Sequence, residues 1–149
     1  MIKEYRMQIA VYDTLPEEAI QIRKSVFVTE QGFYDEFDET DYNARHLVLL
    51  YDGIPAGTCR FFRDNATKEF MIGRLAVLRQ YRGKALGTCL MERAEQEIRK
   101  MGGERVLLHA QQQARPFYEK HGYLACREPD SEQGCPHIWM AKNLSFTLE

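Results

Sequence analysis

The sequence predicts one α/β domain built on a mixed, mostly antiparallel sheet of about seven strands, in the order β-α-β-β-β-α-β-α-β-β. Apolar runs on both sides of Asp52-Gly53 have the pattern of an antiparallel hairpin. A long amphipathic helix at 83–101 lies between two apolar runs, which we expect to be parallel strands joined by a right-handed crossover. The chain of 149 residues is long enough to bury one hydrophobic core, and we draw no domain boundary within 1–149.

The first half of the chain is expected to hold one helix and four strands. Thr14 to Glu17 resembles a capping box, which predicts a helix from there to about Val28. Helical spacing places Arg23 and Phe27 on one face of it. Alternation of apolar and polar residues predicts strands at 7–12, 46–51, 54–63 and 69–77.

The second half is expected to hold two helices and three strands. The helix at 83–101 carries one apolar stripe and stops at Gly102-Gly103. A short helix is expected at about 112–121. The remaining strands are predicted at 106–110, 123–126 and 138–142, the last two joined around 129–136.

Composition and charge exclude several classes of protein. With 44% hydrophobic residues and a net charge of −2, the chain resembles a soluble globular protein and offers no general attraction for nucleic acid or an anionic membrane. The four cysteines form no C-x-x-C pair, so we expect no metal site and a reduced, cytoplasmic protein. No apolar run approaches membrane-spanning length. A homodimer is compatible with this composition.

An anion-binding turn is predicted between Met71 and Thr88. An apolar strand there leads through a basic turn and a glycine into the helix, and a helix start offers unpaired N–H groups and a positive dipole end. Gly83 and Gly87 keep side chains away from an approaching ligand. Between Phe70 and Met91 the chain has four basic residues and no acid. This turn would suit a pyrophosphate.

Two motifs resemble those of the GNAT superfamily of N-acetyltransferases. The family turn, Gln/Arg-x-x-Gly-x-Gly/Ala, is matched by Gln80-Tyr81-Arg82-Gly83-Lys84-Ala85, followed by Leu86-Gly87. A second block, Asn-x-x-Ala-x-x-Phe-Tyr-x-x-x-Gly-Phe, is matched by Gln111-x-x-Ala114-x-x-Phe117-Tyr118-x-x-x-Gly122-Tyr123. The resemblance implies a GNAT-like acyl-CoA N-acyltransferase fold with four helices.

The resemblance also implies a site for acetyl-CoA as co-substrate. The strand backbone at Leu75, Ala76 and Val77 would pair with the pantetheine arm, and Tyr118 would protonate the leaving thiolate. A backbone N–H such as that of Val77 could stabilise the oxyanion. The other residues implied to bind the cofactor are Gln80, Arg82, Gly83, Lys84, Ala85, Leu86, Gly87, Thr88, Gln111 and Phe117.

The general base is not settled by the resemblance. Family enzymes often carry a glutamate on the central strand where this chain has Met71, and Glu69 lies near the far end of that strand. His109, at the end of its own strand, is a plausible substitute because imidazole titrates near neutrality. The alternative is that His109 is a satisfied buried histidine. His46 is a weaker candidate.

The N-terminal third resembles part of the acyl-homoserine-lactone synthases, a GNAT-like fold that uses S-adenosylmethionine and an acylated carrier. The segment 30–41 holds six acids and no base. The shared pattern comprises Arg23, Phe27, Phe33, Glu36, Asp38, Asp41 and Arg60. These residues imply acceptor binding by Arg23, Phe27, Glu36, Asp38 and Arg60. Alternatively, Arg23 and Arg60 pair with the carboxylates of residues 31–41, the acidic loop, and hold this loop in place.

The leading hypothesis is an N-acetyltransferase that moves acetyl from acetyl-CoA to a small-molecule amine or a lysine. Attack would be direct, in a ternary complex, because no cysteine has an activating neighbour pattern. The alternatives are an acyltransferase like the lactone synthases and a non-catalytic domain that binds acyl-CoA.

Overall fold

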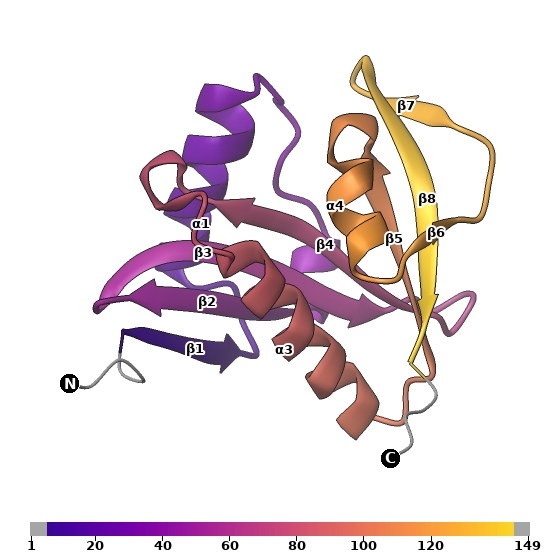
Figure 1. Ribbon diagram of the computed structural model, residues 1–149, viewed down its shortest axis with the longest axis horizontal. Helices are drawn as coiled ribbons and strands as arrows, with labels where there is room; N and C mark the ends of the chain where they lie inside the picture. The colour runs from indigo at the N-terminus through magenta and orange to yellow at the C-terminus, as the bar shows by residue number, and fades with distance from the viewer. Residues whose placement is uncertain (1–5, 145–149) are drawn as a thin grey trace.

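The computed structural model describes residues 6–144, and its centre is one twisted sheet (Figure 1). Neighbouring strands follow the order β1-β2-β3-β4-β5-β8-β6, and β7 pairs with β8 outside that path. Every pairing is antiparallel except β4 with β5. The strands are β1 (Met7–Tyr12), β2 (Arg45–Tyr51), β3 (Ile54–Arg63), β4 (Phe70–Val77), β5 (Arg105–Gln111), β6 (Leu124–Ala125), β7 (Asp130–Glu132) and β8 (Cys135–Asn143). The predicted mixed sheet is confirmed.

Helices cover both faces of the sheet (Figure 1). The larger core lies under α3, where Leu90 and Ile98 pack against Phe61 and other strand residues. A smaller core on the opposite face joins Ile22 and Val26 to Ala76. The helices are α1 (Glu17–Arg23), the π-helical η2 (Lys24–Glu30), α2 (Thr40–Asn43), η3 (Arg79–Tyr81), α3 (Leu86–Lys100), η4 (Gln112–Ala114) and α4 (Arg115–Lys120). Among residues 6–144, no helix is both long and apolar enough to cross a membrane.

The first helix differs from its prediction at both ends. Pro16 is the N-cap, with extended backbone angles, and no side chain caps this helix. Glu17 is therefore the first helical residue instead of the third, so it cannot reach back as a capping box requires. At the other end the helix widens into η2, where the Gln31 N–H donates to the carbonyl of Val26. The capping-box prediction is wrong.

The C-terminal hairpin contains a strand that the sequence did not predict. β7 pairs with β8 through Asp130↔His137 and Glu132↔Cys135. Its side chains are all exposed, so it carries no apolar signal. A tight turn with positive φ at Gln133 and Gly134 joins the two strands.

The parallel strands β4 and β5 separate soon after they begin to pair. Only Phe70↔Val106 and Met71↔Leu107 are matched, and the strands spread apart beyond them (Figure 1). A bulge in β4 contributes, because Arg74 and Leu75 of β4 lie opposite the single Cys59 of β3, and Arg74 has a φ of 54°. This separation opens the sheet at the C-terminal end of β4, beside the start of α3.

Candidate active site

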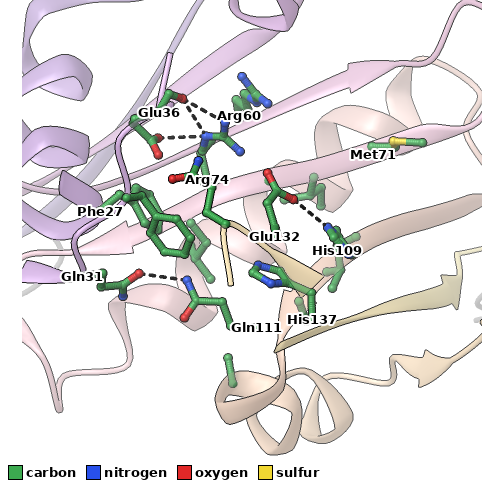
Figure 2. A pocket seen from close by; sticks show the side chains of 18 of the residues that line it. Phe27, Gln31, Glu36, Arg60, Met71, Arg74, His109, Gln111, Glu132 and His137 are labelled. Carbon is green, nitrogen blue, oxygen red and sulfur yellow. Dashed lines mark hydrogen bonds and ion pairs between the residues drawn. The ribbon is translucent and has the colours of Figure 1, made fainter. Parts of the chain in front are cut away.

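A pocket of about 410 Å³ occupies the opening between β4 and β5. Figure 2 shows its walls, which come from both strands, the acidic loop and the β7–β8 hairpin. Eleven residues that the sequence singled out line it: Phe27, Phe33, Glu36, Asp38, Arg60, Met71, Leu75, His109, Gln111, Ala114 and Tyr118. Tertiary structure therefore brings the expected donor side and acceptor side into one cavity.

The basic turn before α3 has the conformation of an anion cradle. Gly83 and Ala85 have φ values of 83° and 63°, in the left-handed region. The first helical backbone hydrogen bond runs from the Cys89 N–H to the carbonyl of Ala85. No side chain caps α3. The N–H groups at 86–88 therefore have no acceptor within the helix and remain available to an anion.

The side chain of Arg82 is held by Glu30. Its Nη1 and Nη2 donate to the Glu30 carboxylate at 2.7 and 2.8 Å, and its Nε donates to the Val77 carbonyl at 2.9 Å. The Arg82 hydrogen bond lowers the pKa of Glu30, so the acid stays ionised. Because Glu30 binds the guanidinium of Arg82, it is the backbone of Arg82, and not its side chain, that is available to an anion bound in the turn.

The other expected cofactor residues lie around the same opening. A Cβ on Gly87 would lie 3.4 Å from the Phe117 ring, so the start of α3 packs directly against α4. Thr88 Oγ1 lies 2.9 Å from His121 Nε2. Gln111 Nε2 donates to Gln31 Oε1 at 2.9 Å, which joins the ends of β5 and η2. Gln80 and Lys84 are exposed on the turn.

Tyr118 lies on α4 and lines the pocket. Its ring packs edge-on against Phe117 and Tyr123. Burial raises the pKa of its phenol, and the neighbouring Cys59 acts in the same direction. No hydrogen bond to its hydroxyl occurs among residues 6–144. Tyr118 is therefore a protonated O–H donor that no protein acceptor occupies.

The acidic loop is held over the sheet by three arginines. Arg23 contacts Glu36 at 2.9 Å and Asp41 at 2.8 Å. Arg60 contacts Asp38 and Asp41, each at 2.8 Å. Arg74, turned toward the loop at the β4 bulge, contacts Glu36 at 2.8 Å. The ion pairs of Arg23 and Arg60 are those expected under the alternative that these arginines hold the acidic loop in place.

Arg23 differs from the other four residues that were predicted to bind the acceptor. It is 1% exposed and does not line the pocket, whereas Phe27, Glu36, Asp38 and Arg60 do. Its guanidinium is occupied by the loop. This geometry suits a residue that positions the loop, not one that touches an acceptor.

The carboxylates of this cluster respond differently to their surroundings. Burial opposes ionisation of Asp41, but hydrogen bonds from Arg23 and Arg60 outweigh it and lower its pKa to about 2. For Glu36, burial prevails over the charges of Arg74 and Arg23, and its pKa is raised. Asp41 is thus the firmly ionised centre of the cluster.

His109 reaches the pocket, but both of its ring nitrogens face carboxylates. Nε2 lies 2.7 Å from Asp130 and Nδ1 lies 3.2 Å from Glu132. The ring also stacks on Trp139, with centroids 4.6 Å apart. An ionised carboxylate only accepts hydrogen bonds, so both contacts form together only when both ring nitrogens carry protons. His46, the weaker candidate, is 1% exposed and contacts the carbonyl of Asp41 instead.

The sequence reasoning did not single out His137, Glu132 or Asp130 as site residues. His137 and Glu132 line the pocket beside His109, and all three share one face of the β5–β8–β7 strands. Alternation along a strand could have indicated that His137 and Trp139 lie on the same face of β8, because every second side chain of a strand points the same way. To place them beside His109, however, one must know that His109 of β5 pairs with Trp139 of β8, and only the tertiary structure gives this pairing.

Cys59 and Cys89 are not set up as nucleophiles. Burial raises the pKa of the Cys59 thiol to about 12, and it raises that of Cys89 as well. Both are neutral thiols near neutral pH, whereas the thiolate is the reactive form.

Comparison with known proteins identifies the family. The family described as "Acetyltransferase (GNAT) domain" matches residues 11–144. The uncharacterized N-acetyltransferase YjcF of Bacillus subtilis is 35% identical over 132 residues, which cover 85% of this chain and 91% of that protein.

Two solved structures resemble the fold and share sequence with it. An acyl-CoA N-acyltransferase from Pseudomonas aeruginosa superposes with a TM-score of 0.80 and 30% identity, covering 91% of this chain and 97% of the other. Escherichia coli ElaA superposes with a TM-score of 0.81 and 26% identity, covering 91% and 99%. The chain belongs to the GNAT family of N-acetyltransferases, which use acetyl-CoA as the acetyl donor.

Proposed function

We propose that this acetyltransferase acetylates a primary amine, on a small molecule or a lysine, by direct attack within a ternary complex. The observation that carries the proposal is that one pocket of about 410 Å³ is lined by Tyr118, by residues of the acidic loop and by His109 and His137. Two substrates held in one cavity can react without a covalent intermediate on the protein. The neutral thiols of Cys59 and Cys89 favour the same route.

The donor is proposed to bind between β4 and β5. The backbone of Leu75, Ala76 and Val77 would pair with the pantetheine arm along the edge that the separation exposes. The pyrophosphate would lie on the turn from Arg82 to Thr88, where the free N–H groups of α3 meet the left-handed residues. Gln80, Gln111 and Phe117 complete this side.

Tyr118 is proposed as the acid that returns a proton to the thiolate of CoA. Its unoccupied hydroxyl and its raised pKa keep a proton available at the pocket. The oxyanion of the tetrahedral intermediate would be stabilised by a backbone N–H of β4 such as that of Val77. His109 is proposed to belong to the catalytic site on the acceptor side.

The acceptor is proposed to be cationic before it reacts. The carboxylates of Asp35, Asp38 and Glu132 line the pocket. They would attract an ammonium group, while Phe27 and Phe33 would cover its apolar part. Phe27, Glu36, Asp38 and Arg60 thus remain proposed acceptor-side residues, and Arg23 positions the loop. The cytoplasm is the proposed location, consistent with four free cysteines.

The test measures donor binding first and turnover second. Acetyl-CoA should raise the melting temperature, whereas S-adenosylmethionine should not. The protein is then incubated with acetyl-CoA and each of ethanolamine, glucosamine, putrescine and lysine, and free CoA is detected with a thiol reagent. Release of CoA that depends on an amine supports the proposal. A shift with acetyl-CoA but no release with any amine or lysine peptide would overturn acetyl transfer to amines.

A further inference from the structure

Resting on the acetyl transfer proposed above, we propose that His137 is the residue that takes the proton from the attacking amine. His137 lies on β8 and belongs to neither motif. Met71 of β4 lines the same pocket but has no titratable group that could accept a proton.

The hydrogen bond of His137 sets its tautomer. Its Nδ1 lies 2.8 Å from the carbonyl oxygen of Cys135. A carbonyl only accepts, so Nδ1 carries the proton and Nε2 of the neutral ring carries the lone pair. No hydrogen bond to Nε2 occurs among residues 6–144. The neutral ring therefore presents a free proton acceptor.

His137 also belongs to the wall of the candidate active-site pocket. The residue is 6% exposed and lines the pocket that holds Tyr118. Figure 2 shows its ring on the pocket wall near Glu132 and Gln111. The Phe33 ring lies edge-on to it, with centroids 6.5 Å apart. The ring is held in place by packing and by its backbone hydrogen bond.

His109 is less suited to the same task. Its two ring nitrogens are both occupied, by Asp130 at 2.7 Å and Glu132 at 3.2 Å. To accept a proton from a substrate it would first have to give up one of these contacts. Its ring lies 4.6 Å from that of His137, so it acts as a neighbour that positions the base.

The titratable groups facing His137 come from two strands. His109 lies on β5, with its ring against that of His137. Asp130, the cross-strand partner of His137, lies on β7 together with Glu132. The two carboxylates hold the His109 ring at 2.7 and 3.2 Å and place negative charge beside it. They also give the imidazolium of His137, once formed, a favourable negative surrounding.

The proton balance of the step is simple. The bound ammonium first loses one proton to water. The neutral amine then attacks the thioester carbon, and a C–N bond forms while the nitrogen becomes cationic. His137 Nε2 takes one proton from that nitrogen. The C–S bond then breaks, and the thiolate takes a proton from Tyr118. The products are the acetamide and CoA, and His137 and Tyr118 return to their starting states by exchange with water.

The experiment compares two variants at His137 with one at His109, using the amine that gives the fastest CoA release. His137→Gln keeps the size and polarity of the side chain. We expect kcat to fall about a hundredfold or more, the KM for acetyl-CoA to change little, and the alkaline rise of the pH–rate profile to disappear. His109→Gln should retain that rise, at a lower rate.

Chemical rescue separates a base from a structural residue. Imidazole added to His137→Ala should restore part of the rate in proportion to its unprotonated form, whereas a merely structural histidine would not be replaced in this way. Each variant is first checked for the wild-type melting shift with acetyl-CoA, so that a misfolded protein is recognised.

The outcomes separate this proposal from the proposed function. If the wild type releases no CoA with any amine, acetyl transfer itself is wrong. If the wild type is active but His137→Gln keeps both its kcat and its pH profile, only the role of His137 is overturned. Loss of the alkaline rise in His109→Gln alone would assign the base to His109 instead.

Discussion

Arg23 and Asp41 form a buried ion pair, with Arg23 Nη1 2.8 Å from Asp41 Oδ1 and side-chain exposures of 1% and 6%. Arg23 belongs to α1, and Asp41 lies at the C-terminal end of the acidic loop, in α2. The pair therefore fastens the loop that forms one wall of the pocket. Asp41 is shared with Arg60 of β3, which connects the loop to the sheet.

Removing Arg23 should destabilise the fold strongly. Arg23→Met leaves Glu36 and Asp41 buried without this partner, and breaking a buried pair from one side costs about 3–5 kcal/mol. Urea unfolding measures the loss. The matched control is Arg115→Ala, which removes an exposed pair with Glu119 and should cost less than about 1 kcal/mol. Equal effects of the two variants would contradict the assignment.

The stability of the protein should fall in acid because of Asp41. Its pKa is about 2 in the folded protein against a usual 3.8, so the unfolded chain binds the proton more readily. Its contribution is complete above about pH 5 and is lost as the pH falls toward about 2, a change on the order of 2 kcal/mol.

Comparison with Asp41→Asn isolates this contribution. The difference in unfolding free energy between wild type and variant should shrink as the pH falls from 5 to 3. The raised pKa of Glu36 works in the opposite direction in both proteins, so it does not enter the difference. A difference that stays constant over this range would rule out Asp41 as the source.

A negative charge in the basic turn should abolish donor binding. Gly83→Asp places a carboxylate where a phosphate is proposed to bind, and calorimetry should detect an affinity for acetyl-CoA at least about tenfold weaker. Gly83→Asn is the control, because asparagine tolerates the φ of 83° about as well as aspartate but carries no charge. Equal losses would attribute the effect to the backbone.

Tyr118 and Tyr123 should respond differently to loss of their hydroxyls. Tyr118→Phe should lower kcat about a hundredfold with little change in stability, since its hydroxyl has no partner among the described residues. Tyr123→Phe removes a 2.7 Å hydrogen bond to buried Glu95, so it should cost about 1 kcal/mol of stability and spare kcat. An unchanged kcat in Tyr118→Phe would remove that residue from the mechanism.

Gly103 should tolerate no side chain. A Cβ there would lie 2.4 Å from Ile98 and 2.8 Å from Phe70, inside the main core. Gly103→Ala should therefore cost about 1–3 kcal/mol in unfolding experiments. Gly73→Ala is the comparison, because a Cβ on Gly73 meets nothing within 4 Å. A loss of the same size at Gly73 would show that crowding is not the cause.

Local sequence determined much of the donor side. Gly83 and the residues after it form an anion turn because backbone preference and helix-end chemistry act over a few neighbouring residues. The strands from β1 to β5 follow from alternation and from the Asp52-Gly53 turn, where both residues have positive φ. Tyr118, which belongs to the second motif, lines the pocket.

Tertiary structure alone decided the acceptor side. Arg23 shares a helix with Phe27, but only packing of the loop buries it and excludes it from the pocket. His109, His137 and Glu132 belong to three strands, and no local pattern states that these strands are neighbours. Helix ends and turns depend on nearby residues, whereas a site assembled across strands depends on the register of the whole sheet.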